Sequence, residues 1–330
     1  MIKLAVLMAL FCFGLTAAAP APPVIFDTDM GNDVDDAIAL AVLHALQTRG
    51  ECRLAAVTIT KDNRWAPVFV SLMNTFYGRP EIPIGIVKGG ATPEDGNYNR
   101  QVAQLTAKGG KPLFPRRLSE TSSVPDAVQV LRRALAAEPD GSVLIVQTGF
   151  STNLARLLDS PPDSISPLSG RELAARKVRL LSVMGGHFTD SAFTEYNIKM
   201  DVPSAQKLFA GWPGPIVAGG YEIGISIQYD PARLESDFRW IPDHPLVHAY
   251  HFYRKMPYRE PLWDPASALY AVRPEGGYFA LSEPGTVTFT AEGATRFQPS
   301  KDGRHRYLIV NDAQRAAVRE AISMLASQPR

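Results

Sequence analysis

The chain has 330 residues, of which 45% are hydrophobic and 20% are charged, with 34 Lys and Arg residues against 33 Asp and Glu residues. This apolar content is enough to bury a large core and excludes an intrinsically disordered chain. The formal net charge of +1 gives no strongly basic surface, so we expect no nucleic-acid partner.

Residues 1–19 have the pattern of a cleaved signal peptide. Lys3 supplies a positive charge, residues 4–15 are apolar, and residues 16–19 are small enough for a cleavage site. No later segment has the roughly 18 consecutive apolar residues that a membrane-spanning helix needs. We therefore expect an exported protein, periplasmic or secreted, without a stable membrane anchor. Cleavage would remove Cys12 and leave Cys52 as the one thiol, which cannot form a disulfide framework.

Short apolar runs alternate with helical stretches along the rest of the chain. The expected strands are residues 24–26, 54–59, 82–87, 143–146, 178–183 and 216–218. The expected helices are residues 37–47, 68–77, 124–137, 152–158, 204–210, 246–255 and 266–271. This alternation predicts an α/β fold with an open, mostly parallel sheet, a mixed edge and helices on both faces. We expect one domain over residues 20–330.

Three further segments complete the expected architecture. Residues 88–115 are too polar and too rich in turn residues for a core, so they predict a long loop beside a site. Residues 286–290 and 306–310 predict a late hairpin. Residues 312–327 predict a final helix with Asp312 as its N-cap.

Five carboxylates in ten residues follow the first expected strand, in the segment Asp27-Thr28-Asp29-Met30-Gly31-Asn32-Asp33-Val34-Asp35-Asp36. The carboxyl ends of strands are where open α/β sheets bind ligands. Asp33 or Asp35 could instead cap the helix that follows, although a cap needs only one or two carboxylates. Five of them repel one another, and a hard divalent cation relieves that repulsion. Without clustered His or Cys, these oxygen ligands favour Ca²⁺ or Mg²⁺ over zinc.

Two enzyme families begin with an acidic strand end of this kind. In a haloacid-dehalogenase-like phosphatase, Asp27 would be the nucleophile and Asp29 the acid. Nucleoside hydrolases of the inosine–uridine-preferring type instead carry Asp-x-Asp-x-Gly, then Asp-Asp-Ala and a helix. Four later segments resemble the nucleoside hydrolases in family order, and the last three have no explanation in a phosphatase: Val57-Thr58 through Asn63; Thr148-Gly149-Phe150-Ser151-Thr152-Asn153-Leu154; Met184-Gly185-Gly186 with Glu195-Tyr196-Asn197; and Trp263-Asp264-Pro265.

The resemblance implies a Rossmann-like fold and Ca²⁺-dependent hydrolysis of the N-glycosidic bond of ribonucleosides, with a small-molecule nucleoside as the partner. It implies that three carboxylates and one backbone carbonyl hold the Ca²⁺: those of Asp29, Asp36, Asp264 and Thr148. Asp35 would take the proton from the attacking water. The sugar would be held by Asn63, Met184, Glu195 and Asn197. The family also implies a homo-oligomer, either a dimer or a tetramer.

Two departures from the family pattern bear on the proposed acid and base. The acidic motif is longer than the shortest family form, so Asp33 competes with Asp35 for the role of base. Trp263 stands where purine-active members carry a His, and an indole can stack on a base but cannot protonate it. His251 or Tyr253 could supply the missing acid or stack on the base, and we take His251 as the candidate. The alternative is that this stretch is a solvated amphipathic helix. The alternatives to a working hydrolase are a metal- and ribose-binding relative with little turnover, or a phosphatase.

Overall fold

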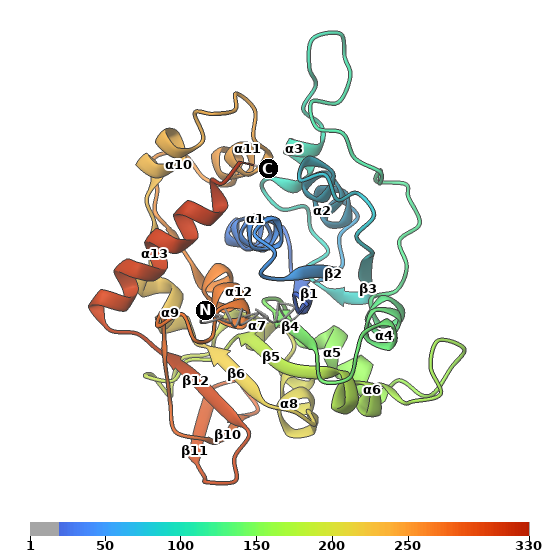
Figure 1. Ribbon diagram of the computed structural model, residues 1–330, viewed down its shortest axis with the longest axis vertical. Coiled ribbons are helices and arrows are strands. Elements are labelled where there is room, and N and C mark those ends of the chain that lie inside the picture. Colours follow the sequence, from blue (N-terminus) through green and yellow to red (C-terminus); the bar gives the residue numbers. More distant parts are fainter. Residues whose placement is uncertain (1–19, 330) are drawn as a thin grey trace, which may run out of the picture.

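The computed structural model describes residues 20–329 (Figure 1). The predicted signal peptide therefore lies outside the described residues. Ten strands form the main sheet of this part of the chain, in the order β11-β10-β12-β6-β5-β4-β1-β2-β3, with β9 paired to β12. Seven neighbouring strands are parallel: β1 (Pro23–Thr28), β2 (Arg53–Lys61), β3 (Ile84–Ala91), β4 (Val143–Gln147), β5 (Val178–Met184), β6 (Ile216–Gly219) and β12 (His305–Ile309).

The other three strands of the sheet run antiparallel at one edge: β9 (Ala280–Leu281), β10 (Gly285–Phe289) and β11 (Thr295–Pro299). A separate two-stranded ribbon joins β7 (Gln228–Tyr229) to β8 (Glu260–Pro261). The predicted mostly parallel sheet with a mixed edge is thus confirmed.

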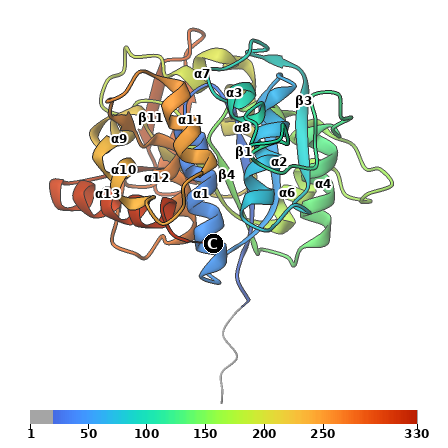
Figure 2. The same cartoon turned by 90° about the horizontal axis from the view of Figure 1, so that it is seen from above.

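Helices cover both faces of this sheet, as Figures 1 and 2 show. The larger core cluster packs one face against α1 (Asp35–Thr48), α2 (Trp65–Phe76), α11 (Pro245–Tyr253), α12 (Trp263–Val272) and α13 (Asp312–Ala326). The second cluster packs the opposite face against α4 (Ala127–Ala137), α5 (Thr152–Asp159), α6 (Gly170–Lys177) and α8 (Val202–Gly211). The remaining helices are short: α3 (Asn99–Ala103), α7 (Tyr196–Met200), α9 (Tyr221–Ser226) and α10 (Pro231–Asp237).

The apolar runs of the sequence become strands because both of their faces are buried. In β1, Val24 and Phe26 belong to the larger core cluster, whereas Ile25 between them belongs to the other. Successive side chains of a strand point to opposite faces, so a central strand between two helix layers must be apolar throughout. β4, which is also buried throughout, pairs in parallel with β1 in the middle of the sheet.

The predicted late hairpin is wrong in its pairing. β10 pairs along its length with β11, whereas β12 runs parallel to β6 and meets β10 at one pair, Gly285 with His305. β11 escaped prediction because its sequence, Thr-Arg-Phe-Gln-Pro, is largely polar and ends in proline, as an edge strand allows. The final helix is capped by Asn311, one residue before the predicted cap.

The expected loop of residues 88–115 contains more regular structure than its composition predicts. β3 continues to Ala91, and α3 forms within the segment. Among the helices of residues 20–329, none has the length and apolar character needed to cross a bilayer.

Candidate functional site

The acidic segment begins at the carboxyl end of β1, next to the carboxyl end of β4. The turn after β4 passes so close to this segment that a Cβ atom at Gly149 would lie 2.6 Å from the backbone nitrogen of Asp29. The backbone nitrogen of Thr148 donates to the carbonyl oxygen of Asp27 at 2.7 Å. Glycine after Thr148 is therefore what allows the ends of these two strands to meet.

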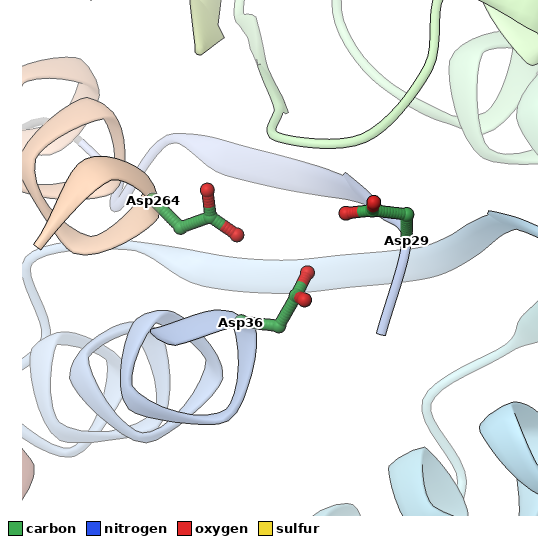
Figure 3. Close-up of side chains that lie close together, drawn as sticks. All are labelled: Asp29, Asp36 and Asp264. Atoms are coloured by element: carbon green, nitrogen blue, oxygen red, sulfur yellow. The ribbon is translucent and has the colours of Figure 1, made fainter. Parts of the chain in front are cut away.

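Three buried carboxylates converge at this point: those of Asp29, Asp36 and Asp264. They come from the loop after β1, the first turn of α1 and the first turn of α12, and Figure 3 shows them pointing toward one another. One oxygen from each lies within 4.8 Å of the others. Thr148 lines the same pocket.

The donor set of this cluster fits a hard divalent cation. Burial raises the pKa of Asp29 to about 7 and holds the pKa values of Asp36 and Asp264 well above their ordinary range. Among the described residues that line the pocket there is no Lys, Arg or His to balance these carboxylates. The hydroxyl oxygen of Thr148 is also buried without a hydrogen-bond partner. Oxygen donors with an unbalanced negative charge suit Ca²⁺ or Mg²⁺.

Helix capping does not account for the carboxylates at the start of α1. The N-cap of that helix is Val34, which makes no side-chain cap. Asp36 instead accepts a hydrogen bond from the hydroxyl of Thr28, and Asp35 accepts one at 3.0 Å from the backbone N–H of Asp264. Both side chains line the pocket, and Asp35 is joined there to Asp264.

A buried lysine supports Asp29 from behind. Lys61 is 1% exposed, and its ammonium group donates to the side-chain oxygen of Asn32 at 2.8 Å and to the carbonyl of Thr92 at 2.8 Å. The amide of Asn32 donates in turn to Asp29 at 2.7 Å. Groups behind a ligand fix its orientation. No sequence motif marks Lys61 as part of a site, because a lone lysine in a strand is usually exposed.

Asp27 lies behind the pocket and does not line it. It is fully buried and accepts hydrogen bonds from Thr58 at 2.6 Å and from Asn153 at 2.8 Å. Burial outweighs these bonds and raises its pKa to about 7. A phosphatase nucleophile has to meet its substrate, so this placement removes Asp27 from that role.

The end of β5 and the start of α7 form the polar side of the pocket. Glu195 accepts hydrogen bonds from the backbone N–H groups of Gly186, Asn197 and Ile198, and burial still raises its pKa to about 7. The amide of Asn197 donates to the carbonyl of Thr148 at 2.9 Å and contacts the sulfur of Met184 at 3.0 Å. This arrangement fixes the carbonyl that belongs to the proposed ligand set.

Three aromatic side chains, Tyr196, Tyr221 and Trp263, also line the pocket. The rings of Tyr221 and Trp263 lie 5.4 Å apart between centroids, and the indole N–H of Trp263 donates to the carbonyl of Tyr221 at 2.8 Å. Tyr221 was missed by the sequence analysis. It directly follows β6 and Gly220, so the rule that sites form at strand ends could have found it.

Nine of the eleven predicted site residues line this pocket: Asp29, Asp35, Asp36, Thr148, Met184, Glu195, Asn197, Trp263 and Asp264. Asn63 does not, because its amide donates to the carbonyl of Pro93 at 2.9 Å and to Asp95 at 3.0 Å, while its oxygen accepts from the backbone of Trp65.

The structure also corrects the placement of His251. Its side chain is 44% exposed and its Nε2 lies 3.1 Å from Glu235, outside the pocket. Two residues along a helix are about 200° apart, so Tyr253 takes the inward position on α11 and its hydroxyl donates to Asp33. α11 thus reaches the pocket rim through Tyr253 rather than through His251.

The buried carboxylates predict an unusual pH dependence for the chelated protein. Their folded-state pKa values are raised above the unfolded ones, so the folded state binds more protons between about pH 4 and 7, and its stability falls as pH rises through that window. We expect the Tm in a chelator to fall from about pH 5 to pH 8, and added Ca²⁺ to raise it most at pH 8. Thermal unfolding followed by circular dichroism measures both effects. A Tm in chelator that rises over this window would contradict this account of the cluster.

Comparison with known proteins agrees with this geometry. The model of the family described as inosine-uridine preferring nucleoside hydrolase matches residues 24–320. Among curated proteins, the chain is 30% identical to the pyrimidine-specific ribonucleoside hydrolase RihA of Salmonella schwarzengrund, over 77% of this chain and 81% of that protein.

Solved structures show the same fold. The plant nucleoside hydrolase PpNRh1 superposes with a TM-score of 0.71 at 22% identity, covering 94% of this chain and 100% of that one. A purine-preferring ribonucleoside hydrolase from Gardnerella vaginalis gives a TM-score of 0.69 at 18% identity, covering 92% and 99%. The named base preferences of these relatives differ, so similarity alone does not select a base.

Proposed function

Because the chain belongs to the inosine-uridine preferring nucleoside hydrolase family, and is thus a hydrolase acting on N-glycosyl compounds, we propose that it cleaves ribonucleosides in a Ca²⁺-dependent reaction with Asp35 as the base. The observation that carries this proposal is the convergence of Asp29, Asp36 and Asp264 in one buried pocket with Thr148. Family membership leaves the phosphatase alternative without support.

The surroundings of Asp35 support its proposed role as the base. One of its oxygens is fixed by the backbone N–H of Asp264, which leaves the other available to a water molecule in the pocket. Burial raises the pKa of Asp35 well above its ordinary value, so the ionised carboxylate is a stronger base than an exposed one. A bound Ca²⁺ would supply an anchor for ribose hydroxyls and polarise the attacking water.

The remaining polar residues suit the sugar and its developing charge. Glu195 and Asn197 line the pocket and are held by hydrogen bonds to neighbouring groups, so they can meet ribose hydroxyls without first being ordered. Hydrolysis of a glycosidic bond passes through an oxocarbenium-like state. Carboxylates around the sugar stabilise that positive charge, because they are already in place when it forms.

A panel of ribosides tests this proposal. We expect p-nitrophenyl riboside, whose leaving group needs no protonation, to be hydrolysed faster than uridine and inosine by at least about tenfold. Activity should be lost in excess chelator and restored by Ca²⁺. Binding of ribose and Ca²⁺ without release of p-nitrophenol would support the alternative of a relative with little turnover. Release that is insensitive to chelator would contradict the metal dependence.

We also propose that the protein is exported after cleavage behind residue 19 and that it forms a homo-oligomer. The first proposal is supported by the signal-peptide pattern of residues 1–19, and the second by the family resemblance. Sequencing the amino terminus of the secreted or periplasmic protein tests the cleavage, and light scattering of the mature protein tests the assembly.

A further inference from the structure

The pocket offers no cationic proton donor to a departing base, and Tyr196, whose pKa burial raises to about 12, is a weak acid there. Among the described residues that line it there is no His, Lys or Arg. The indole N–H of Trp263 donates to the carbonyl of Tyr221, and His251 pairs with Glu235 outside the pocket. A neutral base that leaves unprotonated departs as an anion, which a pocket lined with carboxylates opposes.

We propose that this site prefers ribosides whose base carries a permanent positive charge, such as an N-ribosyl pyridinium. This inference rests on the proposed nucleoside hydrolysis. In such a substrate, the electron pair of the C1′–N bond moves to the ring nitrogen as the bond breaks, which neutralises the base. Water adds to C1′, and the proton that it loses passes to Asp35. The products are ribose, a neutral base and one proton, so no acid is required.

The charge of the pocket favours such a base. Six carboxylate side chains line it, those of Asp29, Asp33, Asp35, Asp36, Glu195 and Asp264. One divalent cation balances only two of these charges if all are ionised. Asp33 is separate from the three converging carboxylates and lies at the rim, where it accepts a hydrogen bond from Tyr253. A carboxylate at this position attracts a cation and repels an anion.

A cavity next to the pocket also carries acidic side chains. A cavity of about 440 Å³ shares Asp33 and Tyr196 with the pocket and adds Glu94 and Asp95. The one cationic side chain lining it is that of Lys61, whose ammonium group is directed to Asn32 and Thr92. Of the four charged side chains that line this cavity, three are acidic, and Lys61 lies 3.7 Å from one of them, Glu94.

Aromatic rings supply the second element of cation recognition. Tyr196, Tyr221 and Trp263 line the pocket, and the rings of the last two are tilted by 33° to each other. Trp263 is held in place because it packs against Gly224, where an added Cβ would lie 2.1 Å from its ring. The face of an aromatic ring attracts a cation by about 0.5–2 kcal/mol, and carboxylates nearby add to that attraction.

The first experiment separates charge recognition from leaving-group reactivity. The Ca²⁺-loaded mature protein hydrolyses p-nitrophenyl riboside in the presence of one of two inhibitors, and the inhibition constant of each is measured. The inhibitors are 1-methylnicotinamide, a pyridinium cation, and nicotinamide, its neutral counterpart. We expect the cation to have an inhibition constant at least about tenfold lower. Nicotinamide riboside should also exceed uridine and inosine in kcat/KM by about 100-fold or more.

Substitutions at Asp33 and Tyr221 test which residues cause the preference for the cationic inhibitor. Asp33→Asn should reduce the preference for 1-methylnicotinamide over nicotinamide, and so should Tyr221→Leu, whereas Tyr221→Phe keeps the ring and should retain it. Circular dichroism verifies that each variant is folded, and Asp33→Glu provides a charged control. If p-nitrophenyl riboside is not hydrolysed at all, the proposed function fails. If it is hydrolysed but the two inhibitors bind equally, or uridine and inosine match nicotinamide riboside, the proposed function stands and the cationic preference is overturned.

Discussion

Asp264→Asn should lower kcat/KM for p-nitrophenyl riboside by about 10³-fold or more and weaken Ca²⁺ binding. The substitution keeps the shape of the side chain and the backbone N–H that Asp35 accepts, but it removes one of three converging negative charges. Loss of a ligand charge costs several kcal/mol of transition-state stabilisation when the cation anchors both sugar and water. Calorimetric titration with Ca²⁺ measures binding independently of turnover.

The matched control for this variant is Asp302→Asn. Asp302 is exposed and follows β11, away from the pocket, so its replacement should leave both measurements within about twofold of the parent protein. If Asp264→Asn binds Ca²⁺ as tightly as the parent, Asp264 is not a ligand and the proposed metal centre is wrong.

Asp35→Asn should lower kcat by about 10²–10⁴-fold with little change in KM, because loss of a base acts on the transition state. Ca²⁺ binding should persist, since Asp35 is not among the three converging carboxylates. Steady-state kinetics with p-nitrophenyl riboside separates kcat from KM without the complication of base protonation.

Asp33→Asn is the comparison that decides between the two candidate bases. Asp33 is held by the hydroxyl of Tyr253, so we expect its replacement to lower kcat for p-nitrophenyl riboside far less than Asp35→Asn does. The reverse order of effects would assign the base to Asp33. A large rise in KM with kcat retained in Asp35→Asn would instead give Asp35 a role in holding a ribose hydroxyl.

The central part of the fold could be predicted because its strands are buried on both faces. The runs that became β1 and β4 are apolar until their last one or two residues, and β5 is interrupted only by Arg179 and Ser182. Few other structures explain such short apolar segments between helices. The antiparallel edge could not be predicted in the same way. One face of an edge strand meets solvent, so β11 contains polar residues, and nothing local shows that β12 pairs with β6.

The site was predictable wherever a motif sits at a strand end, as with Asp29 and Thr148. Residues that reach the site only through tertiary contacts have no such sequence motif. Lys61 becomes part of the site only because Asn32 lies above it, and the choice between His251 and Tyr253 depends on how α11 is rotated. The resemblance also suggested Asn63 as a sugar contact, whereas its hydrogen bonds tie down the loop at Pro93 and Asp95.

The position of β12 has a consequence for biosynthesis. β12 lies between β6 and β10 and comes near the end of the chain. Until residues 305–309 have left the ribosome, β6 is an edge strand with unpaired backbone groups, open to pairing with other chains. A nascent or truncated chain that ends before residue 305 would therefore aggregate rather than form a smaller active enzyme, even though every proposed metal ligand has already been synthesised. A chaperone that shields this edge during synthesis would raise the yield of folded protein.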